Sequence, residues 1–472
     1  MVIHDRWDAD GRYEDASEEL DMDVAEWPPV DNKKLFTLRL EELTHFDVNP
    51  RIEARERNRM RLNEAKTRTD IAHLEVHYTC CVDKALRVVL EELLTCDERE
   101  WVSFTLKGVN ETNDFYTKPN ALQGLSSLFI ALRVVKILNL HSCTLNRGHG
   151  LDSILPSIPF MPNLRELRLQ GWQMDPVSVA LLMESLEWQK SKSVSLLSLR
   201  SCSFIGETTF QRLTEGLANV PQLNTLNLSY CNLRDDELIP LIHSLRDHPS
   251  IECLHIGGNS CITAESVEAI SEWLSEDSCR LRDLNLRALW IGYSDLGLLE
   301  RVVDLGTLFE AIAKNDSLQN ITLSENYLET DDVKRLIGAF PQKTNISFLD
   351  LGMNPFQEKG AQAILTLVRE CTSIEVVRFE NDFTTFGCAD AIKTHALFNY
   401  VDRRLMQKPC DIPLSVWPRA LSRVQEGCDG KSYPESGVQD ILFRLLRAQT
   451  GQNGLPLSFR IAINRKAHSS AM

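Results

Sequence analysis

One short segment has the residue types of a phosphate-binding loop. Gly427-Cys-Asp-Gly430-Lys431-Ser432 places a lysine and a serine directly after a glycine, as loops that cradle phosphates do. Such a loop also needs a glycine five residues before the second glycine, where this chain has Gln425. No apolar strand precedes the segment. The spacing therefore argues against nucleotide binding here.

A second set of residues combines two histidines with two cysteines. His73 and His77 lie on one side of a predicted strand, and Cys80-Cys81 follow. Imidazole and thiolate are ligands that zinc prefers. The two histidines would nevertheless stand about 13 Å apart along an extended strand, too far to share one ion. The sequence also lacks a Gly-x-Ser-x-Gly elbow and a His-Glu-x-x-His pair. We therefore expect no enzymatic activity, no cofactor and no bound metal.

The composition is that of a globular, acidic chain. Of its 472 residues, 43% are hydrophobic and 25% are charged, and the formal net charge is -16. Nucleic-acid binding requires clustered Lys and Arg, so this charge argues against it. The best candidate for a membrane span, residues 125–140, is interrupted by Arg133 and Lys136, so we expect none. Residues 1–10 contain no apolar run, which predicts no secretory signal.

The cysteines indicate a compartment. There are 13 of them, an odd number, and no Cys-x-x-Cys pair occurs. This usage is typical of free thiols in a reducing environment, which places the protein in the cytoplasm or the nucleus. Residues 51–69 hold seven Arg or Lys against three Glu. They fit either a nuclear-localisation or acidic-partner patch, or a solvated helix.

The dominant feature of the chain is a repeat. Residues 223–233 read L-x-x-L-x-L-x-x-C-x-L. The same phase returns in copies that start at residues 35, 71, 101, 135, 164, 194, 223, 251, 281, 318, 346 and 374. Eight of the eleven steps between these starts are 28 to 30 residues long. Chance apolar runs do not hold one phase over so many copies, so the chain is predicted to be a solenoid.

Each copy predicts a short strand, a turn and a helix. Apolar residues at the fourth and sixth positions bury one face of the strand. At the ninth position, Asn can bond open backbone groups of the turn, and Cys fills the same space. Cys143, Cys202 and Cys231 share this position and are predicted to be buried, reduced and unpaired. In the copy that follows residue 164, Asp175 is the predicted helix N-cap and Pro176 the first helical residue.

The repeat resembles the leucine-rich repeat family, and within it the ribonuclease-inhibitor-like class. Asn354-Pro-Phe356-Gln-Glu-Lys-Gly360-Ala361 matches the turn and helix start of that class closely. The resemblance covers residues 35–386. It implies an α/β fold: an open right-handed solenoid, or horseshoe, of about twelve repeats. Parallel strands would line its concave side and helices its convex side.

Three segments follow from this assignment. Residues 1–34 are predicted to be an acidic disordered tail, since residues 1–31 hold eleven acids against two bases. Residues 35–386 form the solenoid. Residues 387–472 form a C-terminal cap and a basic tail.

Within the C-terminal segment, residues 391–406 are predicted to be a capping helix, and the segment around Trp417 should pack on the last repeat. Residues 412–421 are similar to a tail on uncharacterised leucine-rich repeat proteins of diatom-like algae. Two longer copies predict insertions at residues 110–120 and 292–307, which fit either binding loops or neutral length changes.

Strand residues between the buried leucines are expected to point outward on the concave side. Most of them are polar, and basic groups concentrate in the middle copies. The candidate partner-binding residues are Lys107, His141, Arg168, Arg200, His255 and Arg287. A basic stripe on an acidic protein would select a protein partner with an acidic surface. A generic wetted face is the alternative.

The sequence therefore favours a non-catalytic scaffold that binds a protein partner on its concave face and adjacent loops. Long leucine-rich repeats with an acidic tail also resemble Ran GTPase-activating proteins, which implies the alternative of a small-GTPase regulator. In this chain, however, the acidic segment is N-terminal and the C-terminus is basic. The sensor part of an immune-type receptor is a third hypothesis, and residues 1–34 are too short for the nucleotide-binding domain it requires. The partner, the pathway and the oligomeric state do not follow from the sequence.

Overall fold

The computed structural model describes residues 35–39, 57, 60, 64, 72–78, 102–108, 135–141, 151–189, 191–289, 305–340, 345–371, 373–380, 386–393, 395, 396 and 399. Contacts between residues divide the chain into two compact units. The first unit comprises Met1–Leu167 and Gln189–Ser191, and the second comprises Arg168–Trp188 and Lys192–Met472. The predicted insertion at 110–120, the Trp417 segment and nearly all of the insertion at 292–307 lie outside the described residues.

The first unit is built on parallel strands. These are β1 (Leu35–Arg39), β2 (His73–Tyr78), β3 (Ser103–Gly108) and β4 (Ile137–His141), paired in that order. Two 3-10 helices, η3 (Leu151–Ser153) and η4 (Leu155–Phe160), follow β4. Leu74, Phe104 and Leu138 face one another along the register and are at most 1% exposed. The copies that start at residues 71, 101 and 135 therefore contain strands with buried fourth positions.

The register corrects the first copy by two residues. We expected this copy to start at Leu35, with Leu38 in its fourth position. The residue opposite the fourth-position Leu74 is Phe36 instead. A two-residue shift keeps the same side chains on the same side of a strand, so the apolar alternation fits either phase. Only the pairing with the next strand distinguishes them.

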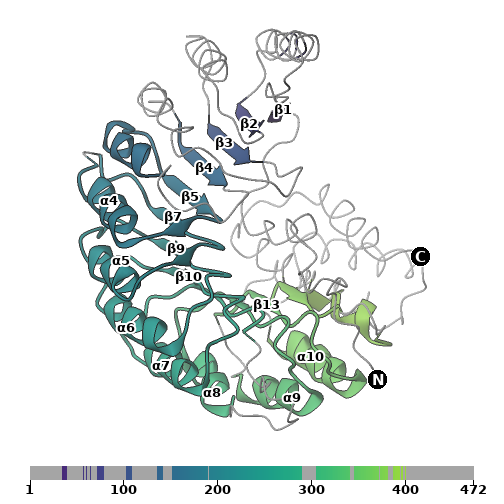
Figure 1. The fold of residues 1–472 in the computed structure, drawn as a ribbon. Coiled ribbons are helices and arrows are strands. Elements are labelled where there is room, and N and C mark those ends of the chain that lie inside the picture. Colours follow the sequence, from purple (N-terminus) through teal and green to yellow (C-terminus); the bar gives the residue numbers. More distant parts are fainter. Residues whose placement is uncertain are drawn as a thin grey trace, which may run out of the picture. The chain divides into compact units, whose positions relative to one another are not determined.

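The second unit contains the regular copies, and the strand β5 leads into it. The strands are β5 (Glu166–Gln170), β7 (Leu196–Ser198), β9 (Thr225–Asn227), β10 (Cys253–His255), β11 (Asp283–Asn285), β12 (Asn320–Thr322), β13 (Phe348–Asp350) and β14 (Val376–Arg378). They are neighbours in that order (Figure 1). From β7 onward the fourth-position residues stand opposite one another, as Leu197, Leu226 and Leu254 do. All three are 0% exposed, as expected for the core of a solenoid.

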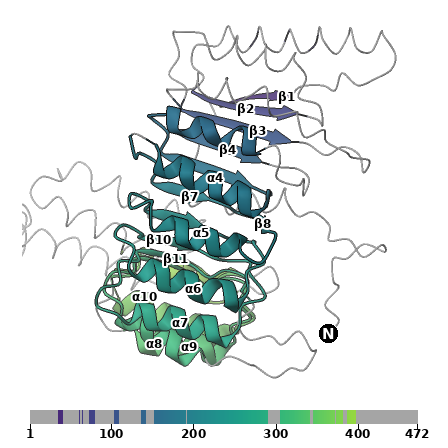
Figure 2. The same cartoon turned by 60° about the vertical axis from the view of Figure 1, so that its left-hand side comes forward.

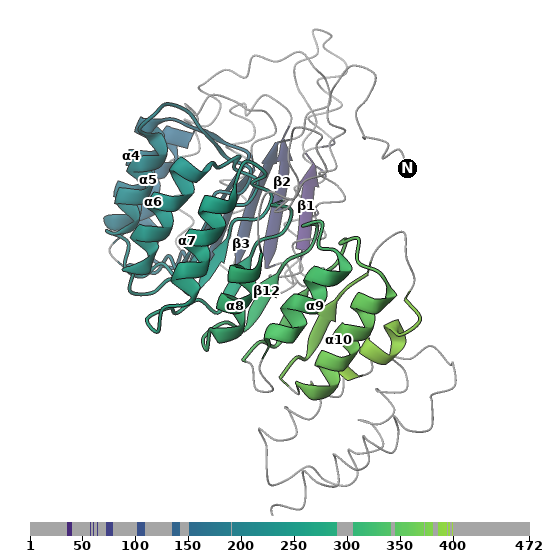
Figure 3. The same cartoon turned by 90° about the horizontal axis from the view of Figure 1, so that it is seen from below.

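Helices cover one side of these strands (Figures 2 and 3). They are α4 (Pro176–Glu187), α5 (Thr209–Leu217), α6 (Asp235–Arg246), α7 (Ala264–Leu274), α8 (Gly306–Lys314), α9 (Thr330–Ala339) and α10 (Glu358–Glu370). A two-residue strand, β6 (Gln173–Met174), pairs with β8 (Ser203–Phe204) between strand and helix. The predicted N-cap is confirmed: Asp175 Oδ1 accepts hydrogen bonds from the backbone N–H groups of Val177 at 2.9 Å and Ser178 at 2.8 Å.

A turn in the left-handed region follows the seven strands β5, β7, β9, β10, β11, β12 and β13. The eighth residue of seven consecutive copies has a φ between 51° and 73°, and only two of the seven are glycine. They are Gly171, Ser201, Tyr230, Gly258, Ala288, Glu325 and Met353. Each N–H donates to the seventh-position carbonyl of the next copy, as Tyr230 does to Gly257 at 2.8 Å. These bonds offset the roughly 1–2 kcal/mol that a non-glycine residue loses in this conformation.

Asparagine at the ninth position ties neighbouring copies together. Asn354 is 0% exposed, and its Nδ2 donates to the Leu323 carbonyl at 3.0 Å and the Leu351 carbonyl at 2.9 Å. Its Oδ1 accepts from the backbone N–H groups of Asn326 at 2.9 Å and Leu328 at 3.0 Å. Asn259 and Asn326 repeat the arrangement.

Cysteine occupies the ninth position in two described copies. Cys202 and Cys231 are free and buried, as predicted. Their Sγ atoms donate to the carbonyls of Leu169 at 3.3 Å and Leu199 at 3.0 Å. A thiol thus replaces the donor half of the asparagine. Cys143 lies outside the described residues.

The beginning of the predicted capping helix packs on the last repeat. Residues 389–393, 395, 396 and 399 are helical. Ile392 and Asn399 are 0% and 1% exposed. Asn399 Nδ2 donates to the carbonyls of Val368, Cys371 and Ile374, at 2.9, 3.2 and 2.8 Å. This one side chain satisfies three backbone carbonyl groups at the end of the last complete copy.

Candidate functional site

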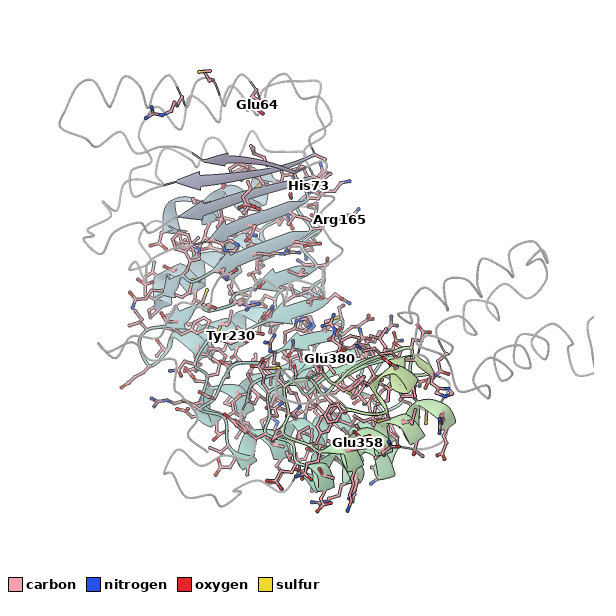
Figure 4. All side chains as sticks on the ribbon, turned by 90° about the vertical axis from the view of Figure 1, so that its right-hand side faces the viewer. Glu64, His73, Arg165, Tyr230, Glu358 and Glu380 are labelled. Atoms are coloured by element: carbon pink, nitrogen blue, oxygen red, sulfur yellow. The ribbon has the colours of Figure 1, made fainter. Side chains whose placement is uncertain are left out.

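In each copy of the second unit, the third, fifth and seventh residues alternate with the buried fourth and sixth residues. They therefore point to the side of the strands opposite the helices. We call these positions the sheet face, and Figure 4 views the strands from this side. In the copy that starts at residue 251 they are Cys253, His255 and Gly257.

Most fifth positions of the sheet face are packed rather than wetted. Five of them are between 4% and 8% exposed: Ser198, Asn227, His255, Thr322 and Asp350. Strands about 4.8 Å apart bring side chains of the same register into contact, so small polar residues shield one another. His255 therefore points to the sheet face but is buried there, with 5% of its surface exposed.

Three fifth-position residues also close their own turns. Oδ1 of Asn227 accepts from the N–H of Ser229, Oδ1 of Asn285 from Arg287, and Oδ1 of Asp350 from Gly352. All three distances are 2.9 Å. These side chains are committed to the backbone, which makes the face rigid.

His255 lies beside an acidic residue of the next strand. Its Nε2 is 3.4 Å from Asp283 Oδ1, and the other oxygen, Oδ2, accepts from Asn320 Nδ2 at 2.8 Å. The imidazole, carboxylate and amide come from three consecutive strands, β10, β11 and β12. His255 therefore has an internal partner.

Arg287 is likewise paired inside the molecule. Its Nε and Nη2 donate to Glu325 Oε1 at 3.1 and 2.5 Å, and its side chain is only 21% exposed. Further along, Arg378 lies 3.9 Å from Asp350, and Lys393 lies 2.9 Å from Glu380. Pairing thus largely neutralises this end of the sheet face.

The Asp350 carboxyl shows how closely this end is packed. Burial raises its pKa, although the positive charges of Arg378 and Arg287 oppose the shift.

Arg168 and Arg200 lie at the other end of the sheet face, in the copies of β5 and β7. Both are half-buried. The Arg200 guanidinium carbon lies 4.9 Å from the centroid of the Tyr230 ring, within the range of a cation–π contact. Tyr230 lies in the next copy and is labelled in Figure 4. Arg168 and Arg200 thus place two positively charged side chains on the sheet face near β5 and β7.

The two remaining candidates belong to the first unit. Lys107 stands opposite His141 in the register of β3 and β4. His141 is half-buried, and the side chain of Lys107 lies outside the described residues. Of the six candidates, four therefore share the sheet face of the second unit, and only Arg168 and Arg200 lie at its basic end.

The internal partners Asp283, Glu325 and Tyr230 were missed by sequence reasoning. Asp283 is a third-position residue, whereas the six candidate residues all lie at fifth and seventh positions. Glu325 and Tyr230 are eighth-position residues, just before the ninth-position Asn or Cys. Charged and aromatic residues at the third and eighth positions of the copies are the sequence signal that identifies all three.

No group of three His, Cys, Asp or Glu side chains among the described residues is placed to hold a metal ion. His73 Nδ1 lies 2.8 Å from Ser103 Oγ. Burial raises the pKa of the Cys253 thiol, on the sheet face, to about 11, so it is protonated at neutral pH and a weak nucleophile. In the part of the chain that is described, no helix has the length and apolar character to cross a bilayer.

Comparison with known proteins adds a sequence match to this geometry. The chain is 26% identical over 209 residues to NACHT, LRR and PYD domains-containing protein 5 of Homo sapiens. The structure separately shows recurring strands, left-handed turns, ninth-position Asn or Cys and helices. The chain has the leucine-rich repeat fold. The aligned part covers 44% of this leucine-rich repeat chain and 16% of the human protein, so the chain spans about a sixth of that relative's length.

Other comparisons are more distant. No family model matches the chain. Among solved structures, it is similar to an internalin from Listeria monocytogenes, at 16% identity and a TM-score of 0.31. That alignment covers 75% of this leucine-rich repeat chain and 87% of the internalin chain.

Proposed function

We propose that this leucine-rich repeat protein is a non-catalytic scaffold whose sheet face in the second unit receives a protein partner. The observation that carries the proposal is the internal bonding of that face. Asn227, Asn285 and Asp350 bond to their own turns, and His255 and Arg287 each have a partner in the next copy. A surface that is ordered before binding loses little conformational freedom on association, so its contacts count toward affinity.

Two further features support this assignment. The described thiols are free, and burial raises the pKa values of several of them, which favours a reducing compartment and disfavours thiol catalysis. We accordingly propose the cytoplasm or the nucleus as its location. The repeats contain full α-helices such as α5 and α10, of 9 and 13 residues, which supports the ribonuclease-inhibitor-like class.

Site-specific photo-crosslinking tests the proposal. A benzophenone amino acid would replace Gln170 or Val376, which lie on the sheet face. In matched controls it would replace Arg212 on α5 or Glu268 on α7, which are exposed on the helices. In cells that express the full chain, we expect partner crosslinks from the sheet positions. Crosslinks that form mainly from the helix positions would overturn the proposal.

A further inference from the structure

Arg200 differs from Arg287 and Arg378 in having no carboxylate partner among the described residues, whereas a ring contact also occurs at Arg378, which lies 5.2 Å from the Phe348 ring centroid. Arg287 and Arg378 lie against the carboxylates of Glu325 and Asp350. Within the described part of the chain, Arg200 makes no ion pair and lies over the ring of Tyr230. Its Nε atom is buried, and its N–H has no acceptor there. The side chain as a whole is half-buried, so an acceptor from outside would bind its other N–H donors and not the buried Nε.

The platform beneath Arg200 is rigid. Tyr230 adopts a left-handed φ of 59°, and its N–H donates to Gly257 at 2.8 Å. The ring lies directly against Gly258, where an added Cβ would fall 2.3 Å from Cδ1 and 2.5 Å from Cε1. Gly258 itself has a φ of 73°, which side chains rarely adopt. Only glycine at position 258 lets the ring occupy this place.

A guanidinium stacked on an aromatic ring keeps its planar edge of N–H donors available. That edge matches the two oxygens of a carboxylate. Arg168, in the copy of β5, adds a second positive charge at this end of the face. The protein as a whole carries a net charge of -16, so a local basic site is selective for acidic partners.

We propose that the Arg200–Tyr230 pair is the anchor for a carboxylate side chain, Asp or Glu, in an acidic segment of the partner protein. The proposal rests on the scaffold function and narrows it to a place and a chemistry. Arg and Tyr are residues that commonly dominate binding energy, and here both are held in position before the partner arrives. Arg287, which is already paired with Glu325, should contribute less than Arg200.

A peptide-display selection tests the anchor. The full chain is screened against random twelve-residue peptides. Binders are retained if they block the photo-crosslink between the partner protein and the benzophenone amino acid at position 170. We expect these peptides to be enriched in Asp and Glu. Arg200→Gln should weaken them about 30-fold, the loss typical of a binding hot spot. Arg200→Lys keeps the charge without the planar fork and should give an intermediate loss.

Arg212→Gln is the matched control, because Arg212 is an exposed arginine on α5. Circular dichroism verifies that each variant is folded. If Arg200→Gln does not fold, Arg200→Lys provides the test. Peptides that bind the sheet face equally in wild type and Arg200 variants overturn the anchor and leave the scaffold function standing. Equal losses in Arg200→Gln and Arg212→Gln also overturn it, because bulk charge then explains the effect. If no peptide blocks crosslinking from the sheet positions, both proposals fail.

Discussion

Replacing Asn354 by alanine should strongly destabilise the second unit. The side chain is fully buried, and its Oδ1 accepts from two backbone N–H groups, those of Asn326 and Leu328. Its Nδ2 donates to the carbonyls of Leu323 and Leu351. Each buried donor left without an acceptor costs about 1–3 kcal/mol. Two such donors give a loss of about 2–6 kcal/mol in the free energy of unfolding, toward the lower end where the backbone relaxes.

Urea denaturation followed by circular dichroism measures this loss, and hydrogen exchange locates it. In Asn354→Ala, the amides of Asn326 and Leu328 should exchange faster than in wild type, because they lose their acceptor. Asn354→Cys should cost less, since a thiol can still donate to a carbonyl, as Cys231 does. The matched control is Asn219→Ala at an exposed position, which should cost less than about 0.5 kcal/mol.

Two results would refute this reasoning. One is a loss in Asn354→Ala no larger than that of the exposed control. The other is unchanged exchange at Asn326 and Leu328 despite lower stability. Either would mean that water or a relaxed backbone replaces the buried amide, and that the ninth-position side chains merely fill space.

Further predictions concern thiols, caps and the C-terminal segment. At about pH 8, iodoacetamide should label the exposed Cys261 in the native protein and leave Cys202 and Cys231 unmodified. Burial raises the pKa of Cys202 to about 12 and that of Cys231 well above its usual value, so rapid labelling of both would contradict their burial. Asp175→Ala removes the acceptor of two N–H groups at the start of α4 and should lower the free energy of unfolding by about 1 kcal/mol, measured in urea. Deleting residues 405–472 should lower the melting temperature, because the apolar end of a solenoid needs a cover, and an unchanged melting curve would contradict this.

Periodicity made the fold predictable, because every copy repeats the same burial problem. The phase of the leucines indicated which residues are buried, and the Asp175-Pro176 pair marked the start of α4. The same periodicity left the first copy ambiguous. Its alternation satisfies two registers equally, and only the pairing of Phe36 with Leu74 decides between them.

The chemistry of the sheet face was less predictable, because it depends on neighbours that are distant in sequence. Arg287 and its partner Glu325 are separated by 38 residues and occupy different positions in their copies. Solvent exposure of His255 depended on the side chains that flank it on neighbouring strands. The left-handed turn at Tyr230 carried no signal, since tyrosine is not a residue that favours positive φ.

The row of hydrogen bonds donated by the eighth-position N–H groups, a ladder that links successive copies, determines where the chain can accept insertions during evolution. The step from residue 281 to 318 is nine residues longer than the step from 223 to 251, since 37 minus 28 is 9. Yet Leu284 still stands opposite Ile321, and the Ala288 N–H still reaches the Ser324 carbonyl at 3.0 Å. Each copy therefore has one part of fixed length, from strand to turn, and one part of free length before the next strand. A domain inserted at 295–300 would leave the register intact, whereas one residue added between strand and turn would break the hydrogen bonds that this copy makes with its two neighbours.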